Sequence, residues 1–323
     1  MTKHARDDFF RNRLFLSELT GFEVDEVQIV RPYVIKLYCK EGSYMIKGFP
    51  SHTRLHSQIA LTNALKETAF THTYQFIPFA NGKLHIQLND KDWAMTPFIK
   101  HGHSFLYSKS RDRNDGAALL RAFHHALADV PSEVKQQFPK FLLLEKWSER
   151  YTTFYQYAHL FAAYLGKQVV HELLQWGYWS MAALQGTKLP QLERKAQDNG
   201  YLIHGDTAEH NFIRSVSGKL YLIDFDLAAI APSEYDFLQY ANRILPHLEW
   251  SLTALSKNSS FPQVASEKWF IAALVYPTDL FREWNRSIRG KGSKKKIKQL
   301  QQWTLKEYHA RKLFVEEIQA MIR

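Results

Sequence analysis

Alternating apolar and polar positions predict several strands in the first part of the chain. Residues 24–30 alternate in this way, and residues 33–39 and 43–49 are rich in β-branched and aromatic side chains. Three residues ending in Gly42 separate the last two runs, so the spacing predicts a hairpin in which glycine supplies the turn. Two further strands are expected around residues 81–82 and 89–90, ending in a strand at 92–99.

A helical period replaces this alternation in the rest of the chain. It first occurs at residues 54–68, and it dominates after about residue 101. Asp115 is a candidate N-cap for a helix at residues 115–128. Further helices are expected at residues 142–165, at 169–184 and from 234 to the C-terminus.

This order of elements predicts an α+β, bilobal architecture. A small β-rich N-lobe is expected at residues 1–100 and a larger, mostly helical C-lobe at residues 101–323. A length of 323 residues suits two domains or one bilobal unit. An apolar fraction of 45% and a charged fraction of 23% are ordinary for a globular protein and exclude disorder as the dominant state.

Cellular location is predicted from what the sequence contains and lacks. No apolar run is long enough to span a membrane, and the start of the chain has no apolar core of a signal peptide. The single cysteine, Cys39, cannot form an internal disulfide and is expected to be a reduced thiol in a strand. We therefore expect a cytoplasmic protein without membrane insertion.

The charge balance points to acidic partners. Lysine and arginine total 42 against 32 acidic residues, a net charge of +10, which favours nucleotides, phosphate-bearing substrates, nucleic acid or an anionic surface. Residues 286–298 contain seven basic residues and no acidic one, a pattern typical of a solvated loop. This run carries most of the excess positive charge, so the rest of the chain is only mildly basic. A nucleic-acid-binding function would rest on charge alone, and we do not expect it.

The segment at residues 201–228 carries the candidate chemistry. Two apolar, β-type runs, 201–203 and 220–223, are each followed by a carboxylate, Asp206 after the first and Asp224 after the second. Ser217-Gly218 suits a turn between the runs, and in a hairpin of this size both ends emerge on the same side.

Asp206, Asn211 and Asp224 are therefore expected to converge, and these residue types suit phosphoryl transfer. One carboxylate, Asp206, would accept the proton of a substrate hydroxyl or orient it, and Asn211 and Asp224 would hold Mg²⁺ between phosphate oxygens. Magnesium prefers oxygen ligands, of which the protein supplies few and phosphate and water supply the rest.

The same residues resemble a known family. His204-Gly205-Asp206, Asn211 and Ile223-Asp224-Phe225-Asp226 are similar to the H-G-D-x-x-x-x-N…I-D-F-D signature of the aminoglycoside phosphotransferase and choline kinase group, which shares the protein-kinase fold. Residues 232–237 match the P-x-x-Y-D segment that follows in that family, whose aspartate, here Asp236, buttresses the catalytic loop. The resemblance spans about residues 24–245, and residues 273–277 with the basic tail are similar to the bacterial spore-coat (CotS-like) branch.

The resemblance also implies a nucleotide site. Lys47 would contact the α- and β-phosphates of ATP, and Ile99, within a segment similar to the interlobe hinge, would offer backbone hydrogen bonds to adenine. Two positions depart from the family. No glycine lies at residues 29–33, where a phosphate-cradling loop is expected, so Arg31 would supply charge instead. Gln58 and Asn63 stand at the places where a helix glutamate would pair with Lys47, and Glu67 comes late, so we expect Lys47 to lack a tight ion pair.

The leading functional hypothesis is ATP-dependent, Mg²⁺-dependent phosphorylation of a hydroxyl on a small molecule. The alternative is a catalytically weak or inactive pseudokinase that serves as a structural or binding protein, for example at a spore coat. The missing glycine loop and helix glutamate favour the alternative, whereas Lys47, Asp206, Asn211 and Asp224 favour the enzyme. The sequence does not predict the oligomeric state.

Overall fold

The computed structural model describes residues 12–257, 261, 266–289 and 294–322, and the chain forms two compact units. The first unit combines residues up to Phe105 with 122–138 and 209–228. The second contains residues 106–121, 139–208 and those from Ala229 onward. The predicted lobe boundary near residue 100 stays a prediction, since the chain returns to the first unit twice after it.

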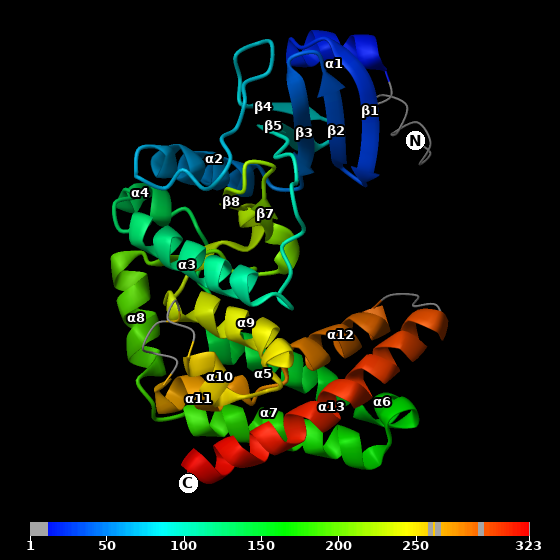
Figure 1. Ribbon diagram of the computed structural model, residues 1–323, viewed down its shortest axis with the longest axis vertical. Helices are drawn as coiled ribbons and strands as arrows, with labels where there is room; N and C mark the ends of the chain where they lie inside the picture. Colours follow the sequence, from blue (N-terminus) through cyan, green and yellow to red (C-terminus); the bar gives the residue numbers. More distant parts are fainter. Residues whose placement is uncertain (1–11, 258–260, 262–265, 290–293, 323) are drawn as a thin grey trace. The chain divides into compact units, whose positions relative to one another are not determined.

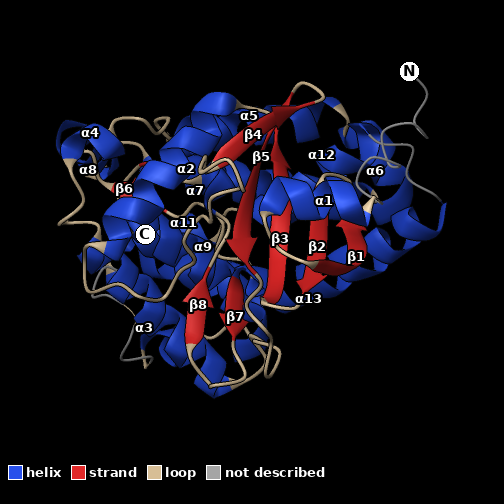
Figure 2. Cartoon of the chain, turned by 90° about the horizontal axis from the view of Figure 1, so that it is seen from above, coloured by secondary structure: helices blue, strands red, loops and turns tan. Residues whose placement is uncertain are grey.

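The first unit is built on a five-stranded antiparallel sheet in the order β1-β2-β3-β5-β4 (Figure 2). The predicted hairpin is present, with Cys39 opposite Gly42 across the turn. Burial raises the pKa of the Cys39 thiol to about 11, with Glu41 and Asp25 adding to the effect, so the thiol stays protonated. The strands are β1 (Val24–Arg31), β2 (Val34–Cys39), β3 (Gly42–Phe49), β4 (His85–Leu88) and β5 (Lys91–Pro97).

Two helices accompany this sheet. Helix α1 (Arg13–Thr20), which the sequence pattern did not predict, begins where the Asn12 side chain accepts a hydrogen bond from the Phe15 amide. It lies across one face of the sheet (Figure 2), and Leu16 packs there into the core with Leu37 and Ile46. Helix α2 (His52–Lys66) begins two residues before the predicted start.

The predicted pairing of residues 201–203 with 220–223 is wrong. In the first unit β8 (Leu220–Leu222) pairs with β7 (Phe212–Arg214), whereas in the second unit β6 (Leu202–Ile203) pairs with β9 (Ala229–Ile230). The Ser217-Gly218 turn joins β7 to β8, with Gly218 at a φ of 84°. The pattern missed this because β7 and β9 are too short to alternate visibly.

Helices make up most of the second unit (Figure 1). Its core contains large aromatic pairs, such as Trp147 stacked on Tyr276 with ring centroids 4.1 Å apart. Helix α4 and the end of α3 belong to the first unit. The helices after α2 are α3 (Ser110–Ala126), α4 (Ser132–Lys135), α5 (Leu143–Gln156), α6 (Ala158–Leu165), α7 (Lys167–Leu184), α8 (Leu189–Asn199), α9 (Glu234–Ile244), α10 (Leu252–Ser256), α11 (Lys268–Leu274), α12 (Thr278–Arg289) and α13 (Lys294–Ile322).

Two helix predictions and one loop prediction need correction. Helix α3 begins at Ser110, five residues before the predicted N-cap, Asp115. The predicted helix at 142–165 is two helices, which meet at Tyr157. The basic run at 286–298 is not simply a loop: its first part ends α12 and its last part begins α13, while residues 290–293 lie outside the described residues.

The length and hydropathy of the helices bear on membrane insertion. Within the described ranges, no helix is both long enough and apolar enough to cross a bilayer. The start of the chain, where no signal peptide was expected, lies outside the described residues.

Candidate active site

Lys47 forms the centre of an ion-pair cluster in the first unit. It lies on β3, opposite Ala94 of β5, and its Nζ donates to Asp224 Oδ1 at 2.9 Å and to Asp226 Oδ2 at 2.6 Å. The expectation that Lys47 lacks a tight ion pair is therefore wrong. Its partners come from the I-D-F-D segment and not from a helix. Lys47 is therefore paired with two carboxylates even though the helix glutamate is missing.

Gln58 on α2 completes this cluster. Its side chain is buried, and Nε2 donates to Asp226 Oδ1 at 2.9 Å. A glutamate here would place a carboxylate against the Asp226 carboxylate, and like charges at this range repel. An amide donor suits Asp226 better, which gives a physical reason for glutamine at the position where the family pattern led us to expect glutamate.

The β7–β8 hairpin places the two predicted metal ligands on neighbouring segments. Asn211 is buried at the end of a 3₁₀ turn, η2 (Glu209–Asn211), directly before β7. The Ile223 amide donates to the Asn211 carbonyl at 3.0 Å, so Asn211 lies beside the residue that precedes Asp224.

Asp224 itself has an unusual backbone conformation. Its φ is 68° and its ψ is 77°, in a positive-φ region that costs a non-glycine residue about 1–3 kcal/mol and is found most often at functional sites. The conformation separates β8 from the 3₁₀ turn η3 (Phe225–Leu227) and lets Asp224 and Asp226 both reach Lys47.

The β1–β2 turn differs from a glycine-rich phosphate loop. Tyr33 occupies the turn with a φ of 64°, a conformation that glycine adopts without cost. Arg31, the last residue of β1, lies with its guanidinium 4.0 Å from Asp224 Oδ2. Arg31 therefore places a positive charge beside Asp224, close to the turn where a glycine loop was expected. The Arg31 side chain is 62% exposed, so solvent screens this charge.

Ile99 directly precedes a segment that is hydrogen-bonded to the β7–β8 hairpin. The Val216 amide donates to the Lys100 carbonyl at 3.1 Å, and the Gly102 amide donates to the Arg214 carbonyl at 2.9 Å. A β-carbon on Gly102 would lie 2.6 Å from the Ser215 carbonyl oxygen, so only glycine permits this approach.

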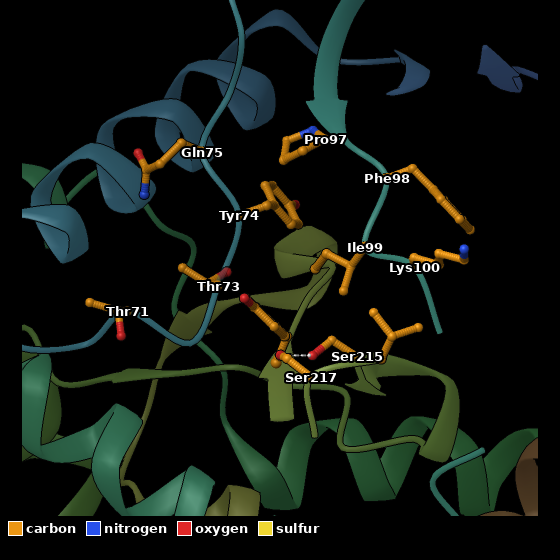
Figure 3. Close-up of a pocket in the computed structure, with 12 residues that line it drawn as sticks. Thr71, Thr73, Tyr74, Gln75, Pro97, Phe98, Ile99, Lys100, Ser215 and Ser217 are labelled. Carbon is orange, nitrogen blue, oxygen red and sulfur yellow. Dashed lines mark hydrogen bonds between the residues drawn. The ribbon is translucent and has the colours of Figure 1, made fainter. Parts of the chain in front are cut away.

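A cavity of about 460 Å³ borders this segment in the first unit (Figure 3). The side chains of Ile99 and Tyr74 face one another across it, whereas Phe98 points away. Lys47, Asn211 and Asp224 are not among the described residues that line this cavity. Ile99 therefore lines a cavity to which the ion-pair cluster contributes no described residue.

Asp206 belongs to the second unit, where its carboxylate is held by an arginine. Arg243 on α9 donates from its guanidinium nitrogen to Asp206 Oδ1 at 2.8 Å, and both side chains are 27% exposed. The Asp206 amide donates to Nδ1 of the fully buried His204 at 3.3 Å. This contact ties the buried His204 ring to the loop that carries Asp206. Arg243 is a site residue that sequence reasoning missed.

Asp236 fastens the loop that carries Asp206. It is fully buried in the first turn of α9, and its two carboxylate oxygens accept hydrogen bonds from the His204 amide at 2.7 Å and the Gly205 amide at 2.9 Å. Gly205 has a φ of 77° in this turn. The buttressing role that the resemblance implied for Asp236 is thus present in the structure.

Asp236→Ala is expected to destabilise the protein strongly. The substitution removes the acceptor of two amides, and a buried donor that loses its acceptor costs about 1–3 kcal/mol. Urea denaturation followed by circular dichroism measures the loss. Asp236→Asn keeps one acceptor oxygen and should lose less, so equal stability of Asp236→Ala and the wild type would show that the two bonds do not hold the loop.

Comparisons with known proteins complete this description. A family model described as "Phosphotransferase enzyme family" matches residues 23–256. A search of curated proteins finds no match. Among solved structures, an aminoglycoside phosphotransferase from Alicyclobacillus acidocaldarius subsp. acidocaldarius DSM 446 aligns with a TM-score of 0.70 and 17% identity, covering 93% of this chain and 92% of its own.

Two further structures contain bound nucleotides. A spectinomycin phosphotransferase in complex with ADP and spectinomycin aligns with a TM-score of 0.62 and 15% identity, over 95% of this chain and 96% of its own. An amicoumacin kinase in complex with AMP-PNP, Ca²⁺ and Ami aligns with a TM-score of 0.60 and 12% identity, over 99% of this chain and 96% of its own. These alignments confirm the predicted kinase-like α+β fold, and the family match covers most of the chain. The chain therefore belongs to the phosphotransferase enzyme family.

Proposed function

We propose that the protein transfers the γ-phosphoryl group of ATP to a hydroxyl group of a small molecule. The observation that carries this proposal is the cluster in which Lys47 binds both Asp224 and Asp226, with the Arg31 guanidinium beside Asp224. Fixed cations can contact the phosphates of a nucleoside triphosphate, and carboxylates beside them can hold its metal ion. Such an arrangement suits phosphoryl transfer, because this reaction depends mainly on positioning and charge stabilisation.

The residues present fit Mg²⁺. Asp224 offers a carboxylate and Asn211 an amide, which together are the hard oxygen ligands that this ion takes from proteins. The bound ion would neutralise charge on the phosphate oxygens. Lys47 would contribute a further positive charge toward the phosphates, and Arg31 would do so from the β1–β2 turn. Both cations lie within hydrogen-bond or ion-pair distance of Asp224.

Asp206 is the proposed base. Its carboxylate would accept the proton of the substrate hydroxyl while the hydroxyl oxygen forms a bond to the γ-phosphorus and the bond to the bridging oxygen of ADP breaks. Arg243, 2.8 Å from Asp206, would orient the carboxylate. Ile99 would contribute backbone hydrogen bonds to adenine. The nucleotide-bound neighbours support these assignments by analogy of fold only.

The alternative is a catalytically weak or inactive pseudokinase that serves as a structural or binding protein. Tyr33 in the β1–β2 turn, where glycine would let amides approach phosphates, favours it. Lys47 favours the enzyme, because it is paired and positioned despite the absence of a helix glutamate. The cytoplasm remains the proposed location, and a spore-coat role remains tied to the alternative.

A thermal-shift screen tests the proposal. ATP with Mg²⁺ should raise the melting temperature, since a ligand that binds only the folded state stabilises it. The shift should be smaller than for kinases with a glycine loop, and a panel of small alcohols added next should identify an acceptor by a further rise. Absence of any shift at millimolar nucleotide would favour the pseudokinase.

A further inference from the structure

Three histidines form a cluster in the first unit that the phosphotransferase site does not use. His52 and His56 lie one turn apart at the beginning of α2, and His85 is the first residue of β4. One ring nitrogen from each lies within 4.8 Å of the others. We propose that His52, His56 and His85 bind a zinc ion.

The geometry of the rings permits a shared ligand. Ring centroids are 4.0 Å apart for His52 and His56, 4.6 Å for His56 and His85, and 5.3 Å for His52 and His85. In a tetrahedral site with bonds of about 2.0–2.1 Å, ligand nitrogens are roughly 3.4 Å apart. Small side-chain rotations therefore bring the three nitrogens onto one ion. His52 and His56 are exposed, so water can supply the fourth ligand.

A buried carboxylate orients one of the three rings. Asp92 on β5 is 7% exposed, and its Oδ2 lies 3.1 Å from His52 Nδ1. A metal-bound histidine commonly donates its other ring N–H to a carboxylate, which fixes the tautomer and raises the basicity of the ligating nitrogen. With Nδ1 bound to Asp92, Nε2 of His52 is the atom left for the ion. Asp92 would thus act as a positioning residue.

Ring packing alone explains this arrangement less well. Three adjacent imidazoles gain little from one another in water and repel when protonated. A zinc ion coordinated by all three rings would make their close approach favourable.

The three imidazole ligands favour a transition metal over magnesium. Imidazole nitrogen is a borderline ligand that suits zinc, copper, nickel and iron, whereas magnesium requires oxygen. The site is therefore chemically distinct from the Mg²⁺ site proposed at Asp224. A zinc ion here would link the beginning of α2 to β4, and α2 is also the helix that carries Gln58, which donates to Asp226.

Calorimetric titration of the tag-free, chelator-treated full chain with zinc tests the proposal. We expect one ion per chain at this site, together with a rise of the melting temperature that Mg²⁺ does not produce. His56→Ala and His85→Ala should each lower the zinc affinity at least 100-fold. Asp92→Asn should lower it about 10–100-fold, the usual effect of an outer partner. Cobalt(II), whose visible absorption intensifies in tetrahedral sites, provides an independent signal.

His159→Ala is the matched control, because His159 is an exposed helical histidine of α6 outside the cluster. It should bind zinc as the wild type does. Melting temperatures of all variants without metal separate loss of binding from loss of folding. Absence of zinc binding by the wild type, or equal binding by the wild type, His56→Ala and His85→Ala, would overturn the proposal.

Discussion

Asp224→Ala is expected to lose both turnover and the Mg²⁺-dependent part of nucleotide binding. Asp224 is the carboxylate on which Lys47 and Arg31 converge, and in the proposed mechanism it holds the ion that offsets phosphate repulsion. Even an outer partner of a metal ligand is worth about 10–100-fold in metal affinity, so loss of a direct ligand should cost at least as much. Calorimetry with ATP, in the presence of Mg²⁺ and of a chelator, measures the difference.

Asp226→Asn is the matched control for this substitution. Asp226 lies two residues away and also binds Lys47, but Gln58 occupies its other oxygen. The variant should therefore keep most of the Mg²⁺ dependence. If Asp224→Ala binds Mg²⁺-ATP as well as the wild type does, the metal site lies elsewhere or does not exist, and the pseudokinase hypothesis takes precedence.

Asp206→Asn is expected to leave Mg²⁺-ATP affinity near that of the wild type and to lower kcat by about 10²–10⁴-fold, the usual worth of a positioned base. Asparagine keeps the shape of the side chain and an oxygen that accepts from Arg243, but it does not accept a proton. Steady-state kinetics on a confirmed acceptor and calorimetry with nucleotide separate the two effects. Full turnover by the variant would show that Asp206 is not the base.

Matching melting temperatures are a requirement for interpreting both substitutions. Asp206 follows a turn that depends on Asp236, so a variant that loosens this turn would lose turnover for a structural reason. A melting temperature within a degree or two of the wild type identifies the loss as chemical.

Local sequence patterns predicted the elements that are long or tightly turned. The β2–β3 hairpin and α2 follow from runs of β-branched and aromatic residues, a glycine turn and a helical period, all of which are local properties. Asp236 and Asp224 were predicted because the family motif places them at fixed distances along the chain. Family membership rested on the same ordered residues.

Long-range pairing was beyond such patterns. Strands β7 and β9 contain three and two residues, too few for alternation, so β6 and β8 were wrongly expected to pair with each other. The partners of Lys47 were also missed, because they lie 177 and 179 residues away. Arg243 had no signal in the sequence, since a single arginine on a helix is ordinary until its carboxylate partner is known.

Phosphorus NMR of ATP with Mg²⁺, the wild-type protein and the acceptor found by thermal shift tests the central claim most directly. The account predicts that the γ-phosphate signal disappears while ADP and one phosphate monoester appear in equal amounts. Nucleotide that binds but remains intact with every hydroxyl compound tested would contradict the assignment of the protein as an active phosphotransferase.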